Sequence, residues 1–251
     1  MLGRLRSLAQ AWRLIKFREV SLTLGDCPLC RGKRPFARLQ ADEIAVRCLG
    51  CQASPISLSL IASLDHWVPD LVDCHVYELS ARGRVFDYLK AHAKSVTGSE
   101  YLDAVTPGEW FNGVQCQDVQ ALTYADGSFE LCTSTEVLEH VPDDGKAMRE
   151  LLRVLKPGGQ LLFTVPLNPG QPTIERAVLQ ADGTIKHLQP PEYHSDPIRD
   201  SAPVLAFRSY GHDIVDRLLE AGFASASIHR PTTLPWQHQS PVVVAIKSAS
   251  R

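Results

Sequence analysis

Long apolar runs, low-complexity segments and internal repeats are all absent from this sequence of 251 residues. The longest clean apolar run, Val242 to Ile246, has the length of one strand, whereas a helix that spans a bilayer needs about 18 to 20 apolar residues. The early residues also lack the apolar stretch and small-residue cleavage site of a signal peptide. We therefore expect neither a signal peptide nor a transmembrane segment, and the 44% of hydrophobic residues predicts a folded core.

An excess of positive charge is confined to the first part of the chain. Residues 1–38 hold nine Lys and Arg residues against two acids, whereas the whole chain has 26 Lys and Arg against 28 Asp and Glu. The rest of the chain is therefore strongly acidic, which disfavours a nucleic-acid groove across it. Nucleic acid stays an alternative partner for the basic front end alone.

Apolar residues recur at helical spacing near the start of the sequence, at Leu2, Leu5, Leu8, Trp12 and Ile15. Basic residues lie mostly between them, so the segment 1–20 is predicted to form a basic amphipathic helix. We expect its apolar face to pack on the rest of this chain. A peripheral membrane contact and a contact with another protein are the alternatives.

The cysteines do not form the even set that a secreted disulfide framework needs, because there are seven of them. Four form two C-x-x-C pairs, Cys27 with Cys30 and Cys48 with Cys51, and four thiolates at this spacing favour a structural zinc ion. Chance pairs of buried or redox cysteines and an iron–sulfur cluster are the alternatives. We expect a zinc-binding module over residues 21–66 with no catalytic role, in a reducing, cytoplasmic compartment.

After Trp67, strand-like runs alternate with helical patterns up to the end of the chain. This rhythm predicts an α/β fold, a doubly wound, mostly parallel sheet of seven strands with helices on both faces, over residues 67–251. The predicted strands lie near residues 72–79, 94–98, 113–117, 129–134, 160–166, 223–229 and 241–247, and the predicted helices near 83–92, 143–155 and 209–221. Residues 168–208 break the rhythm, and a long irregular insertion of this kind is typically functional.

The block from Asp126 to Pro166 carries several short motifs. It reads Asp-Gly-Ser-Phe-Glu-Leu, then Glu-Val-Leu-Glu-His-Val-Pro from Glu136, and then Leu-Lys-Pro-Gly-Gly before Leu-Leu-Phe-Thr-Val-Pro. The block closely resembles the class I S-adenosylmethionine-dependent methyltransferases, in particular the methyltransferase domain 11 type. The resemblance covers residues 72–166 in detail and implies methyl transfer from S-adenosylmethionine to a small-molecule, saccharide or lipid-linked acceptor, at oxygen.

The resemblance implies a cofactor site made of residues that follow successive strands, namely Glu78, Ser80, Gly83, Glu100, Tyr101, Asp118, Val119 and Ser134. Glu78 and the turn after it would face the methionine part and Glu100 the ribose. Asp118 with the backbone of Val119 would face the adenine, and residues 134–136, from Ser134 to Glu136, would lie beside the sulfonium. An acid that ends the second strand is also placed to hold ribose hydroxyls. The sequence departs from the family in this turn, because Ser80 and Arg82 occupy glycine-like places.

The acceptor site is expected in the insertion, where the text Pro-Glu-Tyr-His-Ser-Asp-Pro is similar to a subset of bacterial methyltransferases. Histidine titrates near neutral pH, so His194 is the first candidate for a general base and His187 the second. Asp196 would orient an imidazole and Tyr193 would line the pocket. His140 is interpreted as a packing or helix-capping residue.

Two other functions remain open at this stage. In one, the protein is an RNA methyltransferase whose basic helix and zinc module bind the phosphates of RNA. This function would require RNA binding that depends strongly on salt. In the other, it is a methyltransferase-like scaffold without catalytic activity. The glycine-poor first turn is the feature that favours the scaffold.

Overall fold

The computed structural model describes residues 20–38, 45–194, 203–232 and 240–249. Most of the basic helix predicted over residues 1–20, and Asp196 of the predicted acceptor site, lie outside these residues. Within the described part of the chain, no helix is long and apolar enough to cross a membrane.

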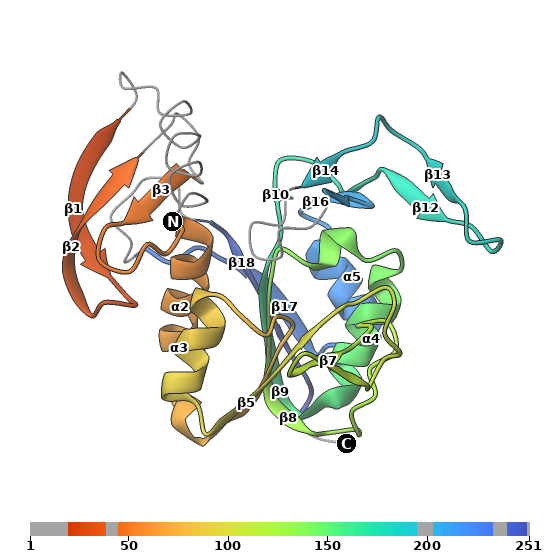
Figure 1. Cartoon of the computed structure of the whole chain (residues 1–251), viewed down its shortest axis with the longest axis horizontal. Helices are drawn as coiled ribbons and strands as arrows, with labels where there is room; N and C mark the ends of the chain where they lie inside the picture. Colours follow the sequence, from red (N-terminus) through yellow and green to blue (C-terminus); the bar gives the residue numbers. More distant parts are fainter. Residues whose placement is uncertain (1–19, 39–44, 195–202, 233–239, 250–251) are drawn as a thin grey trace.

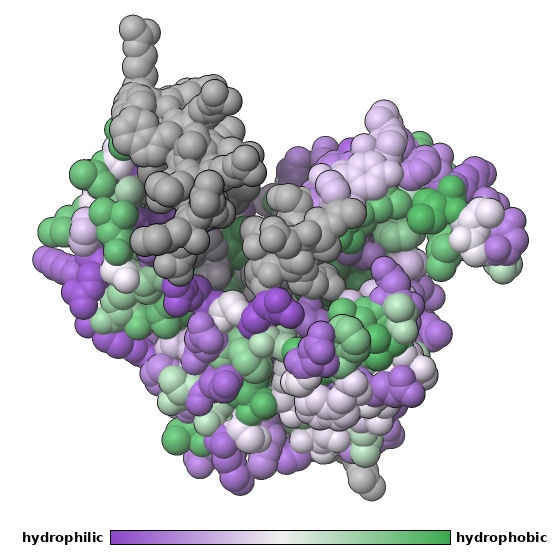
Figure 2. Space-filling model, viewed as in Figure 1, coloured by the Kyte–Doolittle hydropathy of each residue, from purple (hydrophilic) through white to green (hydrophobic). Residues whose placement is uncertain are grey.

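The first described element is a small antiparallel sheet of three strands, β1 (Ser21–Cys27), β2 (Gly32–Arg38) and β3 (Val46–Cys48), in that order (Figure 1). One face of β1 leaves Leu22 and Leu24 exposed, and hydrophobic surface is visible on this side of the molecule (Figure 2). The small sheet thus contributes an apolar outer surface in addition to its cysteines.

The main sheet is built from eight strands, which are β4 (His75–Glu78), β5 (Ser95–Glu100), β6 (Trp110–Phe111), β7 (Val114–Cys116), β8 (Phe129–Thr135), β9 (Leu155–Thr164), β17 (Ser225–His229) and β18 (Val242–Ile246). Their order is β17-β18-β9-β8-β4-β5-β7-β6. The five strands from β9 to β7 are parallel, and β17, β18 and β6 pair antiparallel. The predicted α/β fold with its seven strands is confirmed, and β6 is a two-residue addition at the edge.

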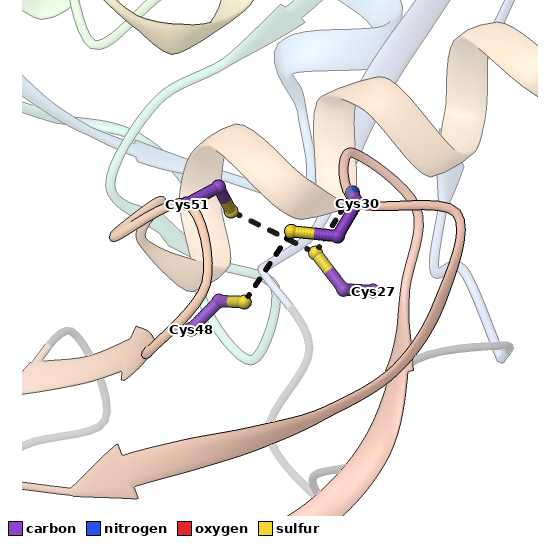
Figure 3. A group of neighbouring side chains, drawn as sticks. All are labelled: Cys27, Cys30, Cys48 and Cys51. Atoms are coloured by element: carbon purple, nitrogen blue, oxygen red, sulfur yellow. Dashed lines mark hydrogen bonds between the residues drawn. The ribbon is translucent and has the colours of Figure 1, made fainter.

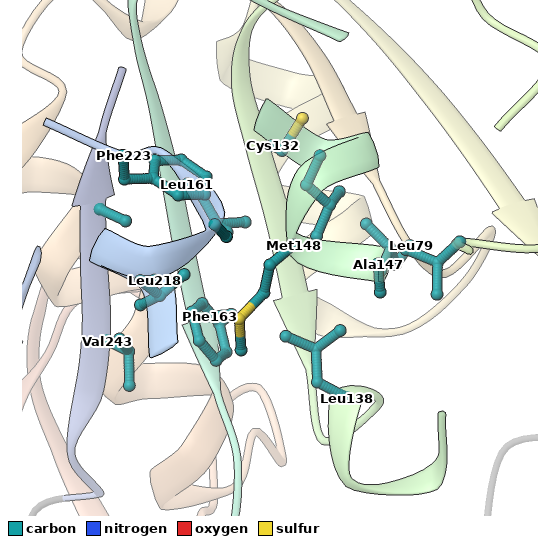
Figure 4. Packing of buried hydrophobic residues seen from close by; sticks show 14 of the residues in the cluster. Leu79, Cys132, Leu138, Ala147, Met148, Leu161, Phe163, Leu218, Phe223 and Val243 are labelled. Carbon is teal, nitrogen blue, oxygen red and sulfur yellow. The ribbon is translucent and has the colours of Figure 1, made fainter. Parts of the chain in front are cut away.

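Helices cover both faces of this sheet (Figure 1). The helices α2 (Pro55–Trp67) and α3 (Arg84–His92) pack on one face, and α4 (Asp144–Val154) and α5 (Ile214–Ala221) pack on the other. The alternation of side chains along a strand explains this. In β9, Leu161 and Phe163 contact the core under α4 and α5, where Met148 lies (Figure 4), while Leu162 contacts the core under α2.

Helix α2 links the small sheet to the main sheet. Its residues Leu58 and Ala62 pack in the core that contains the cysteines, whereas Leu60, Ile61 and Leu64 pack in the core of the main sheet. Ser54 begins the helix, because its hydroxyl accepts a hydrogen bond from the backbone N–H of Ser57. A domain boundary after residue 66 remains a prediction, and the helix before it contributes to both cores.

The last predicted helix begins later than expected. Instead of starting near residue 209, the chain forms strand β16 (Arg208–Gly211), which pairs with β10 (Leu167–Asn168) and β11 (Ile174–Glu175), and α5 starts at Ile214. The reason is a close crossing of backbones, since a Cβ on Gly211 would lie 2.0 Å from the carbonyl oxygen of Gln171. This pairing anchors the insertion to the domain.

The insertion itself consists of small antiparallel pairs. One is β12 (Ala177–Leu179) with β13 (Ile185–His187), and the other is β14 (Tyr193–His194) with β15 (Val204–Leu205). In Figure 1 the β12–β13 hairpin extends outward from the domain, whereas β14 lies close to β10 and β16. The insertion therefore has an outer hairpin and an inner pair near the main sheet.

Candidate functional site

The carboxyl ends of neighbouring parallel strands carry the predicted cofactor residues. Glu78 is the last residue of β4 and Glu100 the last of β5, and the register pairs Glu78 with Gly98 on one side and with Thr133 of β8 on the other. Ligands of open α/β sheets bind at this edge. The structure thus brings the two predicted acids together on adjacent strands.

Glu78 is a buried carboxyl group at the end of β4. It is 2% exposed and accepts a hydrogen bond from the hydroxyl of Thr133. Burial raises the pKa of Glu78 to about 8, and the negative charge of Glu100 acts in the same direction. A cation placed beside Glu78 would favour its ionised form, so this end of β4 is suited to a positively charged ligand.

The glycine-poor first turn is held by Glu100. Three groups converge on Oε1 of this carboxylate: the hydroxyl of Ser80 at 3.1 Å, the backbone N–H of Ala81 at 3.2 Å, and Nε of Arg82 at 3.6 Å. Gly83 then begins α3 with a φ of 101°, a conformation that glycine adopts without strain. The side chains that replace glycine in this turn therefore fasten it to β5.

A glycine outside the turn allows this close packing. A Cβ on Gly98 of β5 would lie 2.6 Å from the ring of Phe86, 2.9 Å from the Cα of Ala81 and 3.0 Å from the carbonyl oxygen of Ser80. Sequence reasoning assigned Gly98 no role. An isolated glycine within a strand is the signal that indicates a close backbone approach of this kind.

The remaining cofactor residues lie along the same edge in different environments. Asp118 follows β7, and its Oδ1 accepts a hydrogen bond from the backbone N–H of Gln120 at 2.9 Å, which closes a turn. Val119 is buried, Tyr101 is exposed, and Ser134 of β8 is fully buried with no hydrogen-bond partner for its hydroxyl among the described residues. Ser134 can therefore form a polar contact with a ligand.

Of the residues predicted for the acceptor site, His194 lies beside a turn that follows β8. Nδ1 of His194 lies 3.9 Å from Oε1 of Glu139, and the rings of His194 and His140 meet edge to face at 4.9 Å between centroids. Tyr193 is exposed. His187 is exposed on strand β13 of the outer hairpin, so these described residues do not form one cluster with it.

Two glutamates of the motif after β8, Glu136 and Glu139, lie next to His194. The resemblance placed Glu136 with Ser134 beside the sulfonium, whereas Glu139 was given no role from the sequence. Glu136 has a φ of 53°, a left-handed conformation that is uncommon for glutamate. Burial raises the pKa of Glu136 to about 7, and burial also raises the pKa of Glu139 well above its usual range. His140 ends the short 3₁₀ turn, its Nδ1 lies 2.9 Å from the carbonyl oxygen of Leu205, and its ring packs on His194, so its packing or helix-capping role stays a prediction.

The four N-terminal cysteines form a compact group between the small sheet and α2 (Figure 3). The Sγ atoms of Cys27 and Cys51 are 3.7 Å apart, and those of Cys30 and Cys48 are 3.9 Å apart. Four sulfurs about 2.3 Å from a zinc ion at tetrahedral corners are about 3.8 Å from one another. The donor set therefore fits a structural zinc ion.

Comparisons with known proteins match parts of this chain to methyltransferases. Residues 78–163 match the model of the family described as methyltransferase domain. The ubiquinone biosynthesis O-methyltransferase of Coxiella burnetii is 42% identical over 99 residues, which are 36% of this chain and 42% of that protein. An arsenite methyltransferase of Aquipseudomonas alcaligenes is 30% identical over 139 residues, or 52% of this chain and 40% of that protein.

A solved structure of an S-adenosylmethionine-dependent methyltransferase from Mesorhizobium loti has a TM-score of 0.46 and 18% identity, and the match covers 74% of this chain and 96% of that one. The chain covers less than half the length of either curated relative. A doubly wound sheet with acidic strand ends defines a ligand-binding α/β protein. Within that class, residues 78–163 of this chain match a methyltransferase domain.

Proposed function

We propose that this protein transfers a methyl group from S-adenosylmethionine to a hydroxyl oxygen of a small-molecule, saccharide or lipid-linked acceptor. The observation that carries the proposal is the pair of buried acids Glu78 and Glu100 at adjacent strand ends, inside the segment that matches the methyltransferase family. The name of the Coxiella burnetii relative, an O-methyltransferase, supports oxygen as the methylated atom.

The residues at the strand ends would each contact a different part of the cofactor. Glu100 would accept hydrogen bonds from ribose hydroxyls, while Glu78 and the Ser80–Gly83 turn would face the methionine part. Tyr101 would lie beside the ribose, Asp118 with the backbone of Val119 would contact the adenine, and Ser134 would lie near the sulfonium. When bound, S-adenosylmethionine supplies the methyl group, its carbon–sulfur bond breaking with the electron pair left on sulfur as the acceptor oxygen bonds to carbon.

The insertion would supply the acceptor side. The inner pair β14–β15 brings His194 and Tyr193 to the turn after β8, close to the strand end that carries Ser134. We assign His194 to the activation of the acceptor hydroxyl and Tyr193 to the pocket wall, with Asp196 nearby in sequence. His187 lies on the outer hairpin, where it would meet only an acceptor that extends beyond the domain.

The N-terminal module would be a structural zinc module without a catalytic role. None of the seven cysteines forms a disulfide, which fits a reducing, cytoplasmic location. The basic segment that precedes the module remains a candidate for contact with a membrane surface or with another protein. A phosphate-rich partner is less favoured, because most of the chain is acidic.

A calorimetric titration with S-adenosylmethionine and S-adenosylhomocysteine tests the proposal. We expect micromolar binding of both ligands by the zinc-loaded protein and at least a tenfold weaker affinity in Glu100→Ala, since two charge-assisted hydrogen bonds to the ribose are lost. Glu220→Gln, which changes an exposed acid on α5, is the matched control and should bind normally. Absence of binding to the folded wild-type protein would contradict the proposal and favour a scaffold.

A further inference from the structure

Three potential metal ligands converge on the acceptor side of the domain. Glu139 and His140 belong to a short 3₁₀ turn, Leu138–His140, that follows β8, and His194 comes from β14 in the insertion. One carboxylate oxygen and one ring nitrogen from each histidine all lie within 4.8 Å of one another. The cluster is separate from the four cysteines.

Glu139 is the anomalous member of this cluster. Its side chain is 1% exposed, and neither of its carboxylate oxygens accepts a hydrogen bond from the part of the chain that the structure describes. Its Oε1 lies 3.6 Å from Nε2 of His140 and 3.9 Å from Nδ1 of His194, distances too long for hydrogen bonds. A buried carboxylate without a partner is costly, so the arrangement calls for a positive charge between these atoms.

In the rings of His140 and His194, the nitrogen that does not face Glu139 lies near a hydrogen-bond acceptor. Nδ1 of His140 lies 2.9 Å from the carbonyl oxygen of Leu205, and Nε2 of His194 lies 3.0 Å from Oε1 of Glu192. A carbonyl or carboxylate oxygen only accepts, so these two ring nitrogens carry the hydrogens. In the neutral rings, the lone pairs are then on Nε2 of His140 and Nδ1 of His194, and both face Glu139.

We propose that Glu139, His140 and His194 bind a divalent first-row transition-metal cation. Two ligands that each lie about 2.1 Å from a metal are at most about 4.2 Å apart, and both distances to Glu139 are within this limit. One carboxylate and two imidazoles suit Zn²⁺, Fe²⁺ or Co²⁺, and they leave coordination positions open for an oxygen of the acceptor. The hydrogen bonds to Leu205 and Glu192 fix the ring orientations, as is usual for metal-binding histidines.

The turn is held in place from its other side without the cation. Arg208 of β16 is 3% exposed and donates hydrogen bonds to the carbonyl oxygens of Leu138, Val141 and Pro142, on both sides of Glu139 and His140. The backbone N–H of Phe207 donates to the carbonyl oxygen of Glu139 at 2.8 Å. Two of the three ligands are therefore positioned before the cation binds.

The role of the cation, unlike its binding, rests on the proposed methyl transfer. A bound cation supplies Lewis acidity, which lowers the pKa of a hydroxyl group that coordinates it. In this arrangement His194 activates the acceptor as a metal ligand and not as a free base, and the hydroxyl proton passes to water. The site would select acceptors whose hydroxyl oxygen can coordinate a metal.

The test uses the full chain with zinc already bound to the cysteines, in the absence of S-adenosylmethionine. Binding of Mn²⁺ is measured by electron paramagnetic resonance as the loss of free Mn²⁺. Binding of Zn²⁺ is measured as the retention of a second equivalent per chain. We expect one Mn²⁺ or one further Zn²⁺ per chain, and at least a tenfold loss of affinity in Glu139→Gln and His194→Gln. The matched control His212→Gln changes an exposed histidine outside the cluster and should bind as the wild type does.

The proposal is overturned if the wild type binds neither cation at this site, a result that would show that protons alone neutralise the cluster. It is also overturned if Glu139→Gln binds the cations as well as the wild type does. Circular dichroism and thermal melting of the variants separate loss of ligands from loss of folding, and His194→Gln, at a half-exposed position, provides a second variant. Cation binding without cofactor binding would refute the methyltransferase proposal alone. Cofactor binding without cation binding would refute this site alone.

Discussion

Gly98 and Ser80 approach so closely that a Cβ on Gly98 would lie 3.0 Å from the carbonyl oxygen of Ser80. The contact joins β5 to the first turn after β4, the turn that lacks the usual glycines. The backbone of the turn can sit directly on β5 because the neighbouring strand has no side chain there. The glycine that allows the two backbones to approach closely is therefore in the neighbouring strand, at Gly98, and not in the turn itself.

Gly98→Ala should destabilise the protein and displace the turn. The added methyl group would meet the backbone of the turn and the ring of Phe86, and such overpacking destabilises by about 1–3 kcal/mol. Urea unfolding and S-adenosylmethionine calorimetry would measure both effects. Gly145→Ala in α4 is the control, because its new Cβ meets the ends of flexible side chains; wild-type stability in Gly98→Ala would show that the turn yields easily.

Glu78→Gln should change how stability depends on pH in the ligand-free protein. The pKa of Glu78 is raised by burial from 4.5 to about 8, so between these values the folded state binds more protons than the unfolded state and stability falls as the pH rises. Relative to the wild type, Glu78→Gln should gain roughly 3 to 4 kcal/mol of unfolding free energy between pH 5 and pH 8. Urea unfolding at several pH values measures the difference.

A constant difference between Glu78→Gln and the wild type across that range would show that Glu78 has an ordinary pKa in the folded protein. Glu220→Gln serves as the comparison, since this exposed acid on α5 should leave the pH profile unchanged. The same profile measured with S-adenosylhomocysteine bound tests whether a ligand at the edge alters the titration.

Cys27→Ser should abolish zinc binding at the cysteines and unfold the small sheet. The core there consists of few residues, too small to be stable alone, whereas the main sheet has its own large cores. Hydrogen exchange should therefore show lost protection over β1–β3 and retained protection in β8 and β9. Cys74→Ala, which changes a buried cysteine outside the cluster, should keep its zinc by elemental analysis.

Wild-type protein that is purified under reducing conditions without chelators and holds no zinc at the cysteines would contradict this prediction. Equal protection of β1–β3 in Cys27→Ser and in the wild type would show that packing of Leu58 and Ala62 on the small sheet suffices for its folding.

His194→Ala should lower turnover while leaving cofactor affinity unchanged. The imidazole lies on the acceptor side, and loss of a group that activates the acceptor reduces turnover by about 100-fold or more. Turnover can be followed as formation of S-adenosylhomocysteine with a panel of phenols and sugars, using any acceptor that supports it. His212→Ala is the control; equal turnover in His194→Ala and the wild type would remove His194 from the acceptor site.

Much of the fold could be predicted because its signals are local. The apolar run of Leu161, Leu162 and Phe163 predicts a strand, and the structure confirms it as part of β9. The predicted start of the last helix was wrong because it depends on a nonlocal contact. The backbone at Gly211 crosses the backbone at Gln171, and the residues before Gly211 therefore form strand β16 instead of a helix. Local helical periodicity carries no information about such a crossing.

The sequence by itself determined the two cysteine pairs, the order of strands and helices, and the acids at the strand ends, since each depends on spacing within a short segment. Tertiary structure alone decided which distant groups meet. It brought His194 to Glu139 and His140, left His187 on the outer hairpin, and used Gly98 to seat the first turn. The physical reason is that burial and lone-pair geometry depend on packing between elements, which residue spacing does not encode.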